Sequence, residues 1–172
     1  MTKLTDVLKP LPNNMTLTVK DLTMPLRWQC HQAVLAWIYE SEFGRQITAL
    51  EFSAFFLDFA PIMKAIVAKG MRVFPPSTDK IYVTPGSVLI FTKQGIPEHA
   101  CVMTENDKII GYNQTDWFTG TGYPSAISTH DTSELKWEGG VVTRHNNKYV
   151  LWAVVEGLAC EVVRSHVVGN TI

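Results

Sequence analysis

Cys30 is the first residue of the sequence whose type and position suggest covalent chemistry. It begins a segment in which apolar residues recur at helical spacing, at positions 30, 33, 34, 37 and 38, so we expect it at the N-terminal end of a helix. There a thiol faces the positive end of the helix dipole and several unbonded backbone N–H groups. These groups lower the pKa of the thiol and can stabilise an oxyanion, which suits a nucleophile. The alternative is an inert cysteine that packs in the core.

His99 is the candidate general base. It follows Pro97 and Glu98 and begins a predicted strand over residues 99–104. A histidine at the start of a strand, directly after a loop that contains proline, is well placed to line a cleft. The alternative is a surface histidine near a loop. If the functional interpretation holds, the imidazole of His99 and the thiol of Cys30 converge in the folded chain.

A third polar residue is expected on the next strand, where it can hold the imidazole ring. A loop of three residues, 105–107, would place Asn113 opposite His99, whereas a two-residue loop would favour Gln114. We favour Asn113, because its shorter side chain loses less rotamer freedom when it holds a ring. Gln114 stays open as an alternative, and so does Asp116 if the strand bends. Turn-forming polar residues are the competing explanation for all three.

Other polar and aromatic residues point less clearly to chemistry. His31 is next to Cys30, but neighbours on a helix do not face each other, so it is a poor base. His130 lies in a segment that we expect to be a polar surface loop. An aromatic group near the third candidate could form a cleft wall or pack in the core: Tyr112, Trp117, Phe118 and Tyr123.

The elements that must position these residues fall into two halves. Helices are predicted from Cys30 to a stop at Gly44, after a capping box of Thr48 and Glu51, and from Pro61 to Gly70. Period-two segments predict strands over residues 15–20, 71–74, 80–84, 87–92, 99–104, 108–113, 141–144 and 149–155, with 159–164 closing the sheet. Helices followed by antiparallel strands predict an α+β fold. We expect one domain over residues 1–172, with 1–14 as an irregular lead-in.

Composition and charge exclude several classes of protein. Apolar residues make up 46% of the chain and the net charge is −1, which is typical of a globular protein without the basic excess of a nucleic-acid binder. Three cysteines without repeated spacing argue against a disulfide framework and a zinc site. The first 14 residues lack the apolar region of a signal peptide, and no stretch is long enough for a membrane helix. We therefore expect no nucleic acid partner, no metal, no cofactor and no membrane span.

Three stretches of the sequence resemble papain-like cysteine hydrolases. The segment at 28–37, Trp-Gln-Cys-His-Gln-Ala-Val-Leu-Ala-Trp, is similar to the nucleophile helix of bacterial papain-fold effectors and toxins. The segments 84–91 and 98–103 resemble the Pro-Gly-strand-His part of NlpC-type enzymes of the same superfamily. The segment 111–114, Gly-Tyr-Asn-Gln, lies where these families place the residue that orients the histidine. The resemblance covers about residues 25–117.

This resemblance implies a fold, an activity and a setting. The fold would be papain-like, with N-terminal helices packed on a C-terminal antiparallel sheet. The activity would be that of a thiol hydrolase that deamidates or cleaves a protein through Cys30, His99 and Asn113. The protein would be a bacterial effector or toxin, held in the bacterial cytoplasm before export and delivered into a target cell by a route that needs no signal peptide. Besides its protein substrate, a cognate immunity or chaperone protein would be its partner.

One position departs from the papain pattern. Papain-type proteases carry a glutamine about six residues before the cysteine for the oxyanion hole, but residues 23–26 here read Thr-Met-Pro-Leu. The resemblance then implies an oxyanion hole made of the backbone N–H of Cys30 and another donor.

Two other functions compete with an effector enzyme. The first is a cell-wall peptidase or amidase of the NlpC type, which the Pro-Gly-strand-His segment favours and the near-neutral charge disfavours. The second is a non-catalytic binding protein that has a papain-like fold but no activity.

Overall fold

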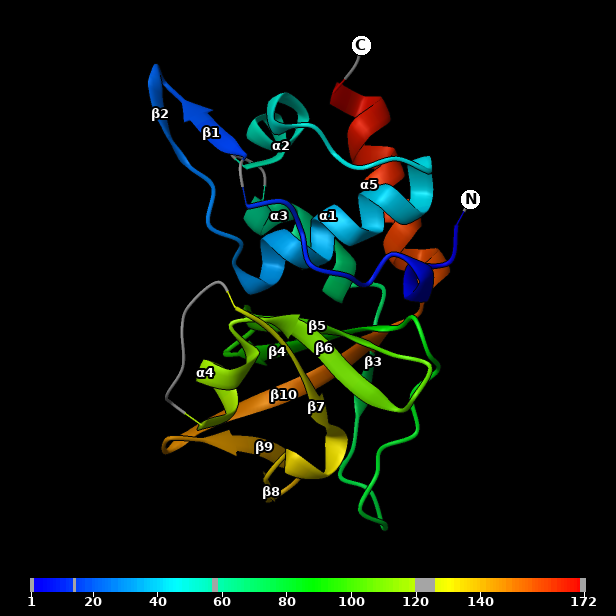
Figure 1. Ribbon diagram of the computed structural model, residues 1–172. Helices are drawn as coiled ribbons and strands as arrows, with labels where there is room; N and C mark the ends of the chain where they lie inside the picture. Colours follow the sequence, from blue (N-terminus) through cyan, green and yellow to red (C-terminus); the bar gives the residue numbers. More distant parts are fainter. Residues whose placement is uncertain (1, 14, 57–58, 120–125, 171–172) are drawn as a thin grey trace.

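Helices pack on both faces of a curled antiparallel sheet (Figure 1). The computed structural model describes residues 2–13, 15–56, 59–119 and 126–170. Its helices are the 3₁₀ turns η1 (Leu4–Asp6) and η2 (Thr132–Glu134) and the α-helices α1 (Cys30–Phe43), α2 (Ala49–Phe56), α3 (Phe59–Val67), α4 (Gln114–Thr119) and α5 (Glu156–Asn170). Helices α1, α3 and α5 lie on one face of the sheet, and α4 packs on the other. The α+β class predicted from the sequence is confirmed.

The main sheet has eight strands within the described residues, in the order β7-β6-β5-β4-β10-β9-β8, with β3 also paired to β10. Its strands are β3 (Met71–Val73), β4 (Val88–Lys93), β5 (Ile96–Met103), β6 (Lys108–Tyr112), β7 (Ile127–Asp131), β8 (Trp137–Glu138), β9 (Val141–Arg144) and β10 (Asn147–Val154). A separate hairpin of β1 (Thr16–Val19) and β2 (Leu22–Pro25) projects beside the helices (Figure 1).

Helix α1 begins and ends where the sequence predicts. The side chains of Gln29 and Gln32 form a capping box at its N-terminus. Gly44 ends it in the left-handed conformation, with φ 72°, which glycine adopts without steric cost. Most of the helix is buried, because it packs against β5, β6 and α5. Cys30 is therefore the first residue of a central, rigid element.

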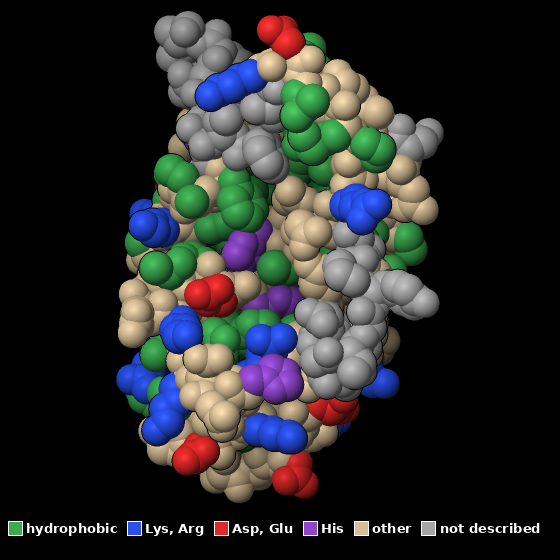
Figure 2. Space-filling view, turned by 90° about the vertical axis from the view of Figure 1, so that its left-hand side faces the viewer, with side chains coloured by type: hydrophobic (Ala, Val, Ile, Leu, Met, Phe, Trp, Pro, Cys, Tyr) green, Lys and Arg blue, Asp and Glu red, His purple; other side chains and the backbone are tan. Residues whose placement is uncertain are grey.

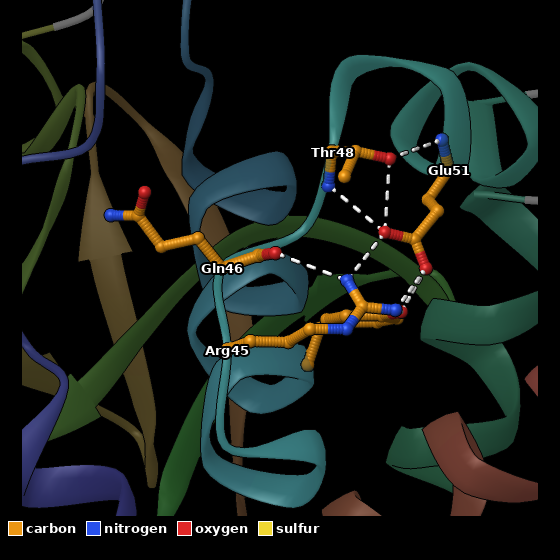
Figure 3. Close-up of polar contacts among 5 residues, drawn as sticks. Arg45, Gln46, Thr48 and Glu51 are labelled. Carbon is orange, nitrogen blue, oxygen red and sulfur yellow. Dashed lines mark hydrogen bonds and ion pairs between the residues drawn. The ribbon is translucent and has the colours of Figure 1, made fainter.

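The predicted capping box at the start of α2 is also present (Figure 3). The hydroxyl of Thr48 accepts a hydrogen bond from the backbone N–H of Glu51 at 3.2 Å, and the Glu51 carboxylate accepts one from the backbone N–H of Thr48 at 3.1 Å. The guanidinium of Arg45, 2.7 Å from the same carboxylate, holds the pKa of Glu51 well below its usual range. These contacts fix the turn that connects α1 to α2.

Two predicted strands are wrong. Residues 159–164 belong to α5, because Ala159, Cys160 and Val163 are buried at helical spacing, and α5 packs against α1. A short apolar run of this kind fits a strand and a helix equally well from sequence alone. Residues 80–84 form no strand, since both edges of the neighbouring strand β4 are already paired, with β5 and β10.

The main sheet has a core on each face. Alternate residues of β4 and β5 pack toward the helices: Val88, Ile90, Ala100 and Val102. The residues between them pack on the opposite face with side chains of α4, β10 and the residue that follows η2: Leu89, Phe91, Cys101, Met103, Trp117, Leu135 and Leu151. His99 packs on this second face, where its ring contacts Phe91 and Trp117.

Candidate active site

The register of the β5–β6 hairpin agrees with the prediction of a three-residue loop at 105–107. Val102 pairs with Ile110, and continuing that register would place His99 opposite Asn113. However, the ladder between β5 and β6 ends at the Val102–Ile110 pair. Before residue 102 of β5 and after residue 110 of β6, the two strands no longer pair, although β5 remains paired with β4.

The thiol of Cys30 lies where this ladder ends. Backbone N–H groups alternate between the two edges of a strand, and the N–H of Met103 points to β4, where it donates to Ser87. The N–H of Ala100 therefore points to the side of β6, beyond the last β5–β6 pair, and there it acts on the thiol of Cys30 and lowers its pKa. Because Ala100 directly follows His99, the N-terminus of α1 meets β5 beside the candidate base.

The pKa of Cys30 differs from the prediction. Burial raises it to about 11, although hydrogen bonds from the backbone of Ala100, His31 and Cys30 itself act in the opposite direction, and the charge of Glu98 raises it further. The expected lowering at a helix N-terminus is therefore wrong for the unliganded chain. The sequence shows the helix end but not the depth of burial, which leaves Cys30 only 8% exposed.

Gln114 is the residue that holds the ring of His99. Its amide oxygen lies 3.0 Å from Nε2 of His99, and its amide nitrogen donates to the carbonyl of Ile109 at 2.8 Å. Because an amide oxygen can only accept, Nε2 carries the ring proton and Nδ1 keeps its lone pair. His99 is thus held in the tautomer whose Nδ1 can accept a proton.

The expectation that Asn113 would hold His99 is not met. The strand ends at Tyr112, and Asn113 adopts a left-handed conformation with φ 58° that turns the chain into α4. Its side-chain amide donates to the amide oxygen of Gln29, at the N-cap of α1. Because of this turn, the side chain of the next residue, Gln114, reaches the ring of His99. The third alternative, Asp116, lies in α4, and its side chain is outside the described part of the structure.

The imidazole of His99 is enclosed by aromatic rings. The indole of Trp117 stacks on it with an interplanar angle of 8°, and the ring of Phe91 lies 5.7 Å away. Burial lowers the pKa of His99 to about 3, and the charges of His31 and Arg144 add to this effect, whereas the hydrogen bond that the ring donates to Gln114 opposes it. His99 is therefore neutral at pH 7.

His31 is also buried next to the candidate nucleophile. Its ring packs on Phe59, with centroids 5.1 Å apart, and burial lowers its pKa to about 4. Its Nε2 has no hydrogen-bond partner within the described residues. The His31 ring is neutral at pH 7. Because His31 directly follows Cys30 on α1, and adjacent residues of a helix do not face each other, it is not placed as a base for the thiol.

The structure places His130 differently from the prediction, and it shows a contact of Trp117 that the sequence did not predict. His130 lies on strand β7, not in a surface loop, and its ring is near Ser128 and Glu134. The sequence did not predict that Trp117 stacks on His99. The sequence does contain a signal for it, because Trp117 lies three residues after Gln114, and this spacing puts the two side chains on one side of a helix. Cys101 is fully buried in the second core, where it packs with its neighbours on β4 and β6.

The face that carries the site combines three kinds of side chain (Figure 2). It is the left-hand side of Figure 1, where the start of α1, the β1–β2 hairpin and α4 lie. Figure 2 shows histidine side chains in the middle of this face, hydrophobic side chains above them, and Lys and Arg side chains beside and below.

Neither a membrane-spanning helix nor a group of metal ligands is present within the described residues. Among the described residues, no helix has the length and apolar character needed to cross a membrane. In the same part of the chain, His, Cys, Asp and Glu side chains do not gather into a group of three that could hold a metal ion.

Comparison with protein-family models, curated proteins and solved structures finds no match for this chain.

Proposed function

We propose that this chain is a thiol hydrolase that acts on amide bonds of a protein substrate. Cys30 is the nucleophile, His99 is the general base, and Gln114 takes the orienting role that the sequence suggested for Asn113. The observation that carries the proposal is the position of Cys30 at the start of α1, where that helix packs against β5 and where the backbone of Ala100, the residue after His99, acts on the thiol and lowers its pKa. Cys30 therefore lies beside the strand residue that follows His99, and the ring of His99 is already oriented by a buried amide.

The arrangement supports a papain-like fold as part of the same proposal. A cysteine begins a buried helix, a histidine lies on a strand that packs against that helix, and a polar residue after the next strand holds the ring. This is the order of elements on which the resemblance to papain-fold effectors and toxins rests. A bacterial effector or toxin that deamidates or cleaves a protein is the class that we propose.

The resting pair is neutral, which determines the first step. With the thiol pKa raised and the imidazole pKa lowered, a thiolate–imidazolium pair is disfavoured before substrate binds. The thiol proton therefore moves to Nδ1 of His99 as sulfur attacks the substrate carbonyl carbon, and the carbonyl π electrons move to its oxygen. Gln114 supports this transfer because it keeps the proton of the resting ring on Nε2.

The N-terminus of α1 supplies donors for the oxyanion. Backbone groups of Cys30 and His31 already reach the sulfur, and the first N–H groups of a helix have no intrahelical partner. An oxygen that develops negative charge beside the sulfur can accept hydrogen bonds from them. The missing glutamine of papain-type proteases would then be replaced by backbone donors.

The second half of the reaction returns the enzyme to its starting state. The C–N bond breaks, the leaving nitrogen takes the proton from His99, and a thioester remains on Cys30. Water attacks this thioester while His99 accepts its proton, and the thiol is restored as the carboxylic acid leaves. Ammonia as the leaving group means deamidation, and a peptide amine means proteolysis.

Mass spectrometry of proteins incubated with the chain tests the proposal. We expect a gain of about 1 Da at glutamine or asparagine residues, or new peptide termini, with the wild-type chain. Cys30→Ala should abolish the modification, and Cys160→Ala, which changes a thiol on α5, should retain it. A modification that survives Cys30→Ala would overturn the proposal.

A further inference from the structure

Exposed apolar side chains gather around β3, at an edge of the main sheet. Met71 is 78% exposed, Phe74 65% and Tyr82 90%, and all three line a cavity of about 550 Å³. Aromatic residues and methionine are enriched in protein interfaces, and contiguous exposed apolar patches mark interaction sites. Figure 1 shows β3 on the right-hand side of the sheet, whereas the start of α1 and α4 lie on the left. This surface is therefore separate from the candidate active site.

Strand β3 has one edge that pairs with no strand of the described part of the chain. Its other edge pairs with β10, where Arg72 lies opposite Trp152. On the same edge of β10, Lys148 lies opposite Thr143 of β9, whose N–H donates away from β10, to the carbonyl of Lys136 at 2.8 Å. Backbone groups alternate along a strand, and Lys148 and Trp152 are an even number of residues apart. The N–H and C=O of Arg72 therefore also point away from β10, to the edge where an added strand would bond to them.

The two faces of β3 differ in chemistry. Side chains alternate between the faces of a strand, so Met71 and Val73 lie on one face and Arg72 on the other. Val73 packs against the second core together with Ile81 and Val83, and all three line the cavity. A strand added to this edge would therefore place alternate side chains against apolar groups, and the side chains between them against the guanidinium of Arg72.

The charge of this surface is positive. Lys69 and Arg72 line the cavity, and none of the described residues in its lining is Asp or Glu. The guanidinium of Arg72 lies over the ring of Phe74, 5.1 Å from its centroid, and donates to the carbonyl of Gly140 at 3.3 Å. Opposite charges on paired strands stabilise a sheet, and like charges destabilise it. A second copy of the chain fits this edge less well than an acidic partner does, because antiparallel pairing around Arg72 would bring two guanidinium groups together.

We propose that the edge of β3 and its cavity, together called the β3 groove, bind an extended segment of a partner protein in which apolar and acidic residues alternate. The segment adds a strand to the sheet and bonds to the backbone of Arg72. Its apolar side chains pack beside Met71 and Val73, and its carboxylates meet the charge of Arg72, with Lys69 adding to the attraction. This binding does not depend on the proposed hydrolase reaction.

Four capped peptides of equal length test the β3 groove on the full chain. The first alternates valine and glutamate, the second has threonine in place of glutamate, the third has lysine there, and the fourth holds the residues of the first in two blocks. The readout is the set of backbone amide resonances of residues 71–73. We expect the first peptide to bind about tenfold more tightly than the second and the fourth, and the third not to bind. Equal affinity of the first and second peptides, or of the first and fourth, would overturn the proposal.

Surface variants locate the binding. Met71→Gln and Arg72→Gln should each weaken the first peptide several-fold, and Arg72→Gln should also reduce the preference for glutamate over threonine. The controls lie outside the cavity lining and should change nothing: Leu50→Gln on α2, where the side chain is 83% exposed, and Lys108→Gln on β6, which is also exposed. Binding that Met71→Gln and Arg72→Gln leave unchanged would refute the β3 groove as its place. Sedimentation of the chain alone completes the test, because dimers that Met71→Gln abolishes would make a second copy the occupant and overturn the acidic partner.

Discussion

The imidazole of His99 lies almost parallel to the indole of Trp117, with ring centroids 4.7 Å apart. The indole comes from α4, the helix that also begins with Gln114, so six residues supply both the ring's stacking partner and its hydrogen-bond partner. Residues three apart on a helix lie on the same side, which lets Gln114 and Trp117 reach one ring together. The orientation of His99 therefore depends on where α4 begins.

Removing the amide of Gln114 should impair catalysis more than removing that of Asn113. Gln114→Ala leaves Nε2 of His99 and the carbonyl of Ile109 without the partners described here, and we expect turnover to fall about 10–1000-fold. Asn113→Gly removes the side chain but keeps the left-handed backbone, and should lower turnover less than tenfold by the same measure. Kinetics of both variants on one substrate decide between them, and the reverse order would restore Asn113 as the orienting residue.

Alkylation of Cys30 should become faster with rising pH up to about pH 11. The raised pKa leaves on the order of 0.01% thiolate at pH 7, so the rate should climb about tenfold for each pH unit between 7 and 10. Rates of iodoacetamide labelling, followed residue by residue by mass spectrometry, give this profile. A plateau near neutral pH would show instead a thiolate stabilised by His99.

The folded chain should lose stability as the pH falls below about 6.5. The pKa values of His99 and His31 are lowered to about 3 and 4, so between pH 6.5 and 5 the unfolded chain binds two protons that the folded chain does not. Their contribution to stability is complete above pH 6.5 and decreases by up to about 2.7 kcal/mol per pH unit below it. Urea unfolding across this range measures the slope, and His31→Phe should reduce it by about half. A flat profile would contradict the burial of both rings as neutral groups.

A methyl group at Gly111 should disturb the hydrogen bond between Gln114 and His99. A Cβ at this position would lie 3.0 Å from the amide oxygen of Gln114 and 3.1 Å from Cβ of Cys101, closer than ordinary van der Waals contact. We expect Gly111→Ala to cost about 1–3 kcal/mol of unfolding free energy and to reduce turnover. The control is Gly157→Ala near the start of α5, where no atom lies within 4 Å and a helix gains from alanine. If Gly111→Ala and Gly157→Ala have equal free energies of unfolding, β5 and β6 can move apart at Gly111 to make room for the added methyl group.

Local sequence patterns predicted the helix and the hairpin that position the candidate site. The limits of α1 followed from the spacing of its apolar residues and from Gly44, and the register of the β5–β6 hairpin followed from a polar loop of three residues. Both depend on contacts between residues close in sequence, which periodicity and turn chemistry describe well. The papain-like arrangement itself stays a prediction.

The errors arose where tertiary packing decides. The position of Asn113 was extrapolated along a strand that in fact ends one residue earlier, and α4 is too short to show a clear helical period. The pKa of Cys30 was judged from its place at a helix end, whereas the sheet that buries it is formed by residues far away in the sequence. Likewise, the apolar run at 159–164 became helical because α1 offers a helical partner.

The burial of the thiols has a consequence for oxidation. All three cysteines, Cys30, Cys101 and Cys160, are free and buried, and burial raises the pKa of each. Oxidants react with the thiolate, so the native chain resists sulfenic acid formation at neutral pH, while unfolding returns each thiol toward its ordinary pKa of about 8.5. Loss of structure, and not exposure to peroxide by itself, is therefore the event that makes this chain sensitive to oxidative damage and to disulfide-linked aggregation.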